Sequence, residues 1–142
     1  FVIMLSARHP PSPAEELAAL AEECAATGQA HLLLNRTVSP RQYRRRETRV
    51  AIIEAGSHHV LAVALFDAVL DHETNRGLGV ALYEDAKPPL PKVWLRLSQL
   101  ELLDPPRPLE SLGWTVKRYN TLLTNETLPR GHAAMYFQVL TE

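Results

Sequence analysis

Residues 49–66 read RVAIIEAGSHHVLAVALF, and this stretch decides the fold class. Two apolar runs, at 49–55 and 59–70, flank the polar tripeptide Gly56-Ser57-His58. Short apolar runs on either side of a turn that contains glycine are typical of a β-hairpin. The second run is apolar throughout residues 60–66, so we expect the rest of the protein to cover both of its faces.

Upstream of the hairpin, the sequence predicts a helix at 13–27. Ser12 is a suitable N-cap, Pro13 takes the first helical position and Glu15 completes a capping box. Gly28 supplies a C-terminal stop. Apolar or small side chains recur on one face of this helix at helical spacing: Leu17, Leu20, Ala21 and Cys24. We therefore expect the cysteine to be a small core residue rather than a nucleophile.

The remaining segments predict more strands and little helix. Strands are expected at 1–5, 30–35, 92–103 and 133–140, with a single helical turn at 109–112. The prolines of segment 104–108 are expected to end the strand before them, and 71–91 reads as a long irregular excursion. This order predicts an α+β fold, a small and partly open antiparallel β-barrel with one or two packed helices. A doubly wound parallel sheet is disfavoured because the later strands lack intervening helices.

Length and composition are consistent with one domain spanning residues 1–142. The sequence begins with Phe1, as in a domain cut from a longer protein or a chain that has lost a leader. A net charge of −1 provides no global field for an anionic polymer. One cysteine excludes an internal disulfide and suits a reducing compartment, so we expect a cytoplasmic protein. No apolar run is long enough to cross a membrane.

Motifs for catalysis, metals and cofactors are missing from the sequence. The six histidines show neither the helical i, i+4 pairing nor the CxxC partner of a metal site. No serine lies in a GxSxG elbow, and Gly77-Leu78-Gly79 lacks the rest of a phosphate loop. We therefore predict no metal, no cofactor and no catalytic residue, and we expect the chain to bind something rather than to catalyse a reaction.

The segment 36–49 carries six arginines and one acid, Glu47. Arginine presents a planar fork that suits phosphate and can also stack on bases. Phosphate contact is therefore one interpretation, carried by four of these residues: Arg36, Arg44, Arg45 and Arg46. The other interpretation is a solvated face that is balanced by the acids of the 67–85 region.

Two tryptophans have informative positions. Trp94 alternates with its neighbours in the 92–103 strand, so it projects on the side of Arg96 and away from Leu95. Trp114 follows Gly113 and precedes a polar segment at 117–120. Each indole is either a core residue or one wall of a base pocket.

The hairpin at 49–66, the strand KVWLRLSQL at 92–100 and the proline-rich PPRPLESL at 105–112 resemble PUA-like domains, particularly the EVE and YTH branches. The resemblance implies a reader module that holds a modified base of DNA or RNA in an aromatic-lined pocket. It also implies basic loops on the nucleic-acid backbone and a fused or associated nuclease as partner. In the segment where family members often have a tryptophan, this sequence has His31 and Asn35. The candidate pocket residues are Trp94, Trp114, Tyr83, Asn35 and Asn120.

Two other functions remain open. Some ASCH-type relatives of the fold are enzymes that act on RNA or modified nucleosides, and Glu54 with Lys92 or Lys117 is the pairing that such an enzyme would use here. A protein-interaction domain also fits the proline-rich connections and the near-neutral charge. The burial and surroundings of Glu54 discriminate between the enzyme and the reader.

Overall fold

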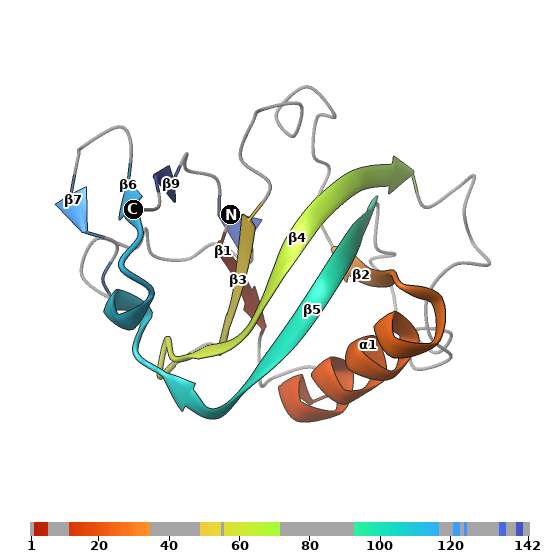
Figure 1. Cartoon of the computed structure of the whole chain (residues 1–142), viewed down its shortest axis with the longest axis horizontal. Coiled ribbons are helices and arrows are strands. Elements are labelled where there is room, and N and C mark those ends of the chain that lie inside the picture. The colour runs from red at the N-terminus through yellow and green to blue at the C-terminus, as the bar shows by residue number, and fades with distance from the viewer. Residues whose placement is uncertain are drawn as a thin grey trace.

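The computed structural model describes residues 2–5, 12–34, 49–54, 56–71, 93–116, 121–122, 124, 134–135 and 139–140. Within these residues, a curved six-stranded sheet forms an open half-barrel with one helix, α1 (Pro13–Thr27), packed on it (Figure 1). In sheet order its strands are β2 (Ala30–Leu34), β5 (Val93–Arg107), β4 (Val60–Asp71), β3 (Arg49–Glu54), β1 (Val2–Leu5) and β8 (Ala134–Met135). A second, three-stranded sheet contains β7 (Thr121–Leu122), β6 (Thr115–Val116) and β9 (Val139–Leu140).

The predicted hairpin and its long neighbour make the middle of the large sheet. Strands β3 and β4 pair antiparallel around the turn at 56–57, and β4 pairs antiparallel with β5 along most of its length. The expectation of an all-antiparallel sheet was wrong at β1, which runs parallel to β3. A parallel pair needs a long crossover connection. Here α1 and β2 lie between β1 and β3 in the chain, so the connection is long enough.

Helix α1 forms where its end signals predict it. The Ser12 side chain accepts a hydrogen bond from the Glu15 backbone N–H at 3.3 Å, and Pro13 is the first helical residue. At the other end, Gly28 adopts the left-handed conformation, with φ 85°, and its N–H donates to the Cys24 carbonyl oxygen. Leu17 and Leu20 are buried against the sheet, and Cys24 packs beside them as expected.

Alternation along the strands divides the core between the two faces of the sheet. Ile3 and Ile52 belong to the cluster beneath α1, whereas Val2, Ala51 and Ile53 belong to a second cluster. Two features that follow β5 complete this second cluster: a one-turn 3₁₀ helix at Leu109–Leu112, and Trp114. The 3₁₀ helix confirms the expected helical turn. Both faces of the central strands are therefore covered.

The expected end of the third long strand, at residue 103, was wrong. Strand β5 continues through Pro105 and Pro106 to Arg107. Its pairing with β4 passes from Ala62↔Leu102 directly to Val60↔Arg107, so the prolines lie in an irregularity of the ladder. A residue without a backbone N–H is tolerated at such a place because no ladder hydrogen bond needs it.

The single strand expected at 133–140 was also wrong. The structure has two short strands there, β8 and β9, and they belong to different sheets: β8 pairs with β1, and β9 pairs with β6. The intervening residues 136–138 lie outside the described part of the chain.

Candidate functional site

Three strands of the large sheet meet at one end, which we call the Val93 end. Leu34, the last residue of β2, and Asp71, the last residue of β4, both pair with Val93 at the start of β5. Strand β3 begins short of this end, because its first residue, Arg49, pairs with Leu65, which lies opposite Ser98 on β5 (Figure 1). The segment 72–92 therefore leaves and rejoins the described chain at the Val93 end, whereas the segment 35–48 leaves it there and rejoins it at Arg49.

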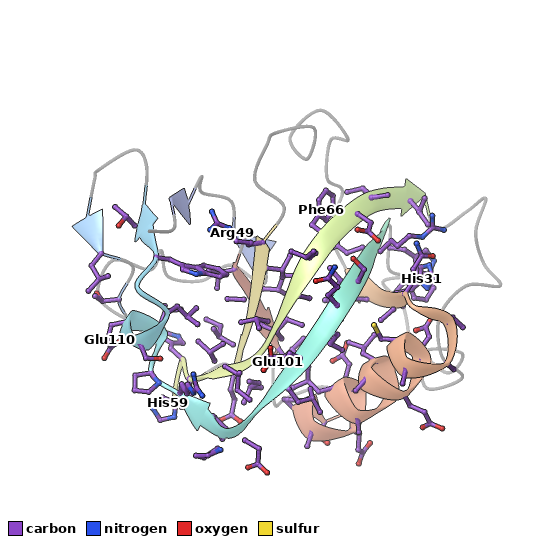
Figure 2. The ribbon with its side chains drawn as sticks, viewed as in Figure 1. His31, Arg49, His59, Phe66, Glu101 and Glu110 are labelled. Carbon is purple, nitrogen blue, oxygen red and sulfur yellow. The ribbon has the colours of Figure 1, made fainter. Side chains whose placement is uncertain are left out.

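A carboxylate from α1 holds a histidine on the edge strand β2. The Glu23 Oε1 atom lies 2.7 Å from His31 Nδ1, and Glu23 Oε2 accepts the His31 backbone N–H at 3.2 Å. Strand β2 is at the edge of the sheet, so Glu23 satisfies an N–H group that no neighbouring strand pairs with. His31 is 6% exposed, and Figure 2 shows it beside the C-terminal half of α1.

The second ring nitrogen of His31 accepts a hydrogen bond from an arginine on the neighbouring strand. His31 and Arg96 are register partners of β2 and β5, and the Arg96 Nε–H donates to His31 Nε2 at 3.2 Å. An imidazole that donates from Nδ1 to a carboxylate and accepts at Nε2 is neutral, in the Nδ1–H form. Glu23, His31 and Arg96 thus form a continuous chain of carboxylate, imidazole and guanidinium, which we call the Glu23–His31–Arg96 chain.

Within the described part of the protein, the Nη groups of Arg96 have no partner. Arg96 is partly exposed, and among the described residues no group accepts a hydrogen bond from its Nη atoms or forms an ion pair with it. Guanidinium carries five N–H donors in a rigid fork that matches phosphate and carboxylate oxygens. Because Nε is fixed on an imidazole rather than on a carboxylate, Arg96 keeps its full positive charge for a ligand.

Trp94 packs beside His31. The two rings are perpendicular, with an interplanar angle of 87° and centroids 6.5 Å apart. Trp94 is 2% exposed, and it pairs across the sheet with Leu33 on β2 and Leu70 on β4. The structure therefore confirms that Trp94 shares the side of Arg96, and its burial favours the core interpretation of this indole.

Trp114 is also buried, at 8% exposure, in the second core cluster. The Arg49 guanidinium carbon lies 5.8 Å from the centroid of its ring, a cation–π distance. Arg49 is the last member of the arginine-rich segment and the first residue of β3, where it pairs with Leu65 near the middle of β4. The contact thus fixes one arginine of that segment against the core.

The other predicted site residues lie outside the described part of the chain: Arg36, Arg44, Arg45, Arg46, Asn35, Tyr83 and Asn120. Asn35 directly follows β2, and the arginines continue from it toward Arg49. Their proposed contacts stay predictions. The structure shows that the segment 35–48 follows Leu34 at the Val93 end of the sheet and precedes Arg49, which pairs with Leu65.

Sequence reasoning missed the roles of Glu23 and His31. His31 stood out only as a departure from the family pattern, and Glu23 was not singled out. A signal was available, because His31 is the polar residue of the apolar strand AHLLL and Arg96 lies between Leu95 and Leu97. The register that places them opposite each other joins residues far apart in the sequence, and no local pattern contains it.

Glu54 forms hydrogen bonds that stabilise the β3–β4 turn. Its Oε1 atom accepts the Ser57 hydroxyl at 3.2 Å, and its backbone groups bond with those of His58 and His59. Glu54 is the last residue of β3, so it lies at the end of the sheet opposite the Val93 end. Lys92 and Lys117, its expected partners in an enzyme, lie outside the described residues.

The described residues contain neither a metal-binding cluster nor a membrane-spanning helix, and the chain matches no known protein. Among the described residues, no group of three or more histidine, cysteine, aspartate or glutamate side chains is placed to hold a metal ion. None of the described helices has the length and apolar character that crossing a membrane requires. No family model, curated protein or solved structure matches the chain.

Proposed function

We propose that this domain binds nucleic acid at the Val93 end of its sheet, as a PUA-like reader of a modified base in DNA or RNA. The observation that carries the proposal is the Glu23–His31–Arg96 chain, which orients a charged guanidinium whose Nη groups have no partner among the described residues. A phosphate group is a suitable ligand for such a fork, because two N–H groups can bond two of its oxygens at once.

The connectivity of the sheet supports a larger basic surface around Arg96. The arginine-rich segment 36–49 leaves the sheet after Leu34 at the Val93 end and returns to it at Arg49, which pairs with Leu65. The Arg49–Trp114 contact fixes this point of return. Phosphate contacts by Arg36, Arg44, Arg45 and Arg46 would extend the surface along a nucleic-acid backbone, because phosphates repeat regularly along each strand.

Base recognition is assigned in this proposal to Asn35, Tyr83 and Asn120, which follow or lie between strands of the two sheets. Trp94 and Trp114 are more than nine-tenths buried, so a base can stack on either indole only if a covering side chain moves. In this role Trp94 packs against the His31 ring and limits its movement, and it does not contact the base. A fused or associated nuclease is the proposed partner that would act on the nucleic acid the domain binds.

Replacing Arg96 tests the proposal directly. The Arg96→Gln variant loses the guanidinium charge, so it should bind a fluorescein-labelled duplex DNA about tenfold more weakly than the wild type, since a charge-assisted hydrogen bond is lost. The slope of log affinity against log salt should also decrease by about 0.9, the contribution of one phosphate contact. Fluorescence anisotropy at several salt concentrations measures both quantities.

Arg107→Gln is the matched control. Arg107 is exposed and is the last residue of the same strand, at the end of β5 opposite Val93. The Arg107→Gln substitution removes the same charge from the domain, so a loss of affinity caused by net charge alone would occur in both variants. Equal affinities and equal salt slopes for the Arg96 and Arg107 variants would contradict a phosphate site at Arg96.

A further inference from the structure

We infer that His31 and Glu23 are positioning residues for Arg96, and that protonation of His31 releases this arginine and so weakens phosphate binding at acidic pH. The inference rests on the proposed function for its ligand, and on the Glu23–His31–Arg96 chain for its mechanism. His31 does not reach the ligand itself, because its ring is 6% exposed between α1, β5 and Trp94.

Whether His31 can accept a hydrogen bond from Arg96 depends on which nitrogen of the His31 ring carries the proton. Glu23 accepts from Nδ1 at 2.7 Å, and this leaves Nε2 as the atom with a lone pair. Arg96 can only donate, so it needs that lone pair, and its Nε lies 3.2 Å from it. A proton added at Nε2 replaces the acceptor with a second donor, and no attractive contact with the Arg96 Nε–H remains.

The charges around His31 decide the direction of the pH effect. Glu23 faces the ring from α1, Arg96 faces it from β5, and the other described neighbour in ring contact is the indole of Trp94. A protonated His31 would be paired with the Glu23 carboxylate and would repel Arg96. The Arg96–His31 hydrogen bond is therefore present while the imidazole is neutral and is lost when Nε2 gains a proton.

An added positive charge could instead strengthen the attraction for phosphate, and the salt dependence separates these two effects. Release of Arg96 removes one phosphate contact, so the slope of log affinity against log salt becomes shallower at acidic pH. A protonated histidine that attracts phosphate would make the slope steeper and the binding tighter. Affinity and slope must both decrease on acidification if the inference is correct.

The decisive variant is His31→Gln, which does not titrate. The amide oxygen of glutamine lies about where Nε2 lies in histidine, so it can accept from Arg96 at every pH. Between about pH 7.5 and pH 5.5, wild-type affinity for labelled duplex DNA should fall about tenfold, whereas the His31→Gln variant should bind equally well at both. His31→Leu has no acceptor, so it should bind weakly throughout. Far-ultraviolet circular dichroism establishes that each protein is folded at both values.

NMR provides a readout that needs no nucleic acid. At about pH 7.5 the His31 ring should show the Nδ1–H form, and the Arg96 Nε–H should exchange slowly with water. On acidification the Nε–H signal should disappear with the same midpoint as the His31 ring titration, and in His31→Gln it should persist. An Arg96 signal that is independent of the His31 titration would overturn the inference, as would the same pH profile of binding in wild type and His31→Gln. Equal binding by Arg96→Gln and wild type would instead contradict the proposed phosphate site.

Discussion

At the scale of single residues, Gln99 is the most unusual position in the sheet. Its φ is 49°, in the left-handed region, although it lies within strand β5. Here the ladder shifts register, because Leu65 pairs with Ser98 and Val63 pairs with Glu101. A β-bulge at this point explains the left-handed residue, because such bulges place one residue in that conformation.

Replacement of Gln99 by glycine should therefore stabilise the protein. The left-handed conformation is unfavourable by about 1–2 kcal/mol for a residue with a Cβ atom, whereas glycine loses about 0.5–1 kcal/mol through the entropy of the unfolded chain. We expect a net increase of about 0.5–1 kcal/mol in the free energy of unfolding. Glu101→Gly, at another exposed position of the same strand but outside the left-handed region, should destabilise by about 0.5–1 kcal/mol. Urea unfolding measures both, and destabilisation by Gln99→Gly would contradict the assigned strain.

At the scale of elements, a substitution at the C-terminal end of α1 measures the cost of the left-handed backbone conformation separately from steric clashes. Gly28 has φ 85°, and a Cβ atom added there would meet no heavy atom within 4 Å. Gly28→Ala should thus cost about 1 kcal/mol in the free energy of unfolding, entirely from the left-handed backbone. Gly28→Asn should cost less, because asparagine tolerates this conformation better. Thermal unfolding of the two variants is the measurement, and equal costs would show that the cap does not depend on conformation.

Elements with local signals could be predicted from the sequence, and elements defined by distant pairing could not. Ser12, Pro13 and Gly28 mark α1 because capping needs neighbouring residues alone. By contrast, β5 passes Pro105 and Pro106 because the distant strand β4 leaves their positions unpaired, which no pattern within residues 104–108 contains. The candidate site has the same limitation. Alternation along the strand predicted the side on which Arg96 lies, but its partner His31 can be identified only from the pairing of β2 with β5.

At the scale of the whole molecule, charge is distributed unevenly although the net charge is −1. The sequence concentrates six arginines in segment 36–49, which follows Leu34 at the Val93 end of the sheet. Local concentration of one sign of charge creates a field that net charge does not report. Binding to a polyanion is therefore compatible with a nearly neutral domain, and its salt dependence should reflect the number of arginines that contact phosphates.

Simultaneous replacement of Arg44, Arg45 and Arg46 by alanine tests whether these arginines belong to one surface with Arg96. If each contacts a phosphate of duplex DNA, the triple variant should reduce the salt slope by up to about three units, and adding Arg96→Gln should reduce it by about one more. The loss of affinity should be the same for different DNA sequences, because phosphate contacts carry no sequence information. Salt titrations of the triple and quadruple variants, with Arg107→Gln for comparison, measure the slopes. A triple variant with the wild-type slope would show that the segment is a solvated face, whereas a quadruple variant no shallower than the triple would separate Arg96 from the nucleic-acid surface.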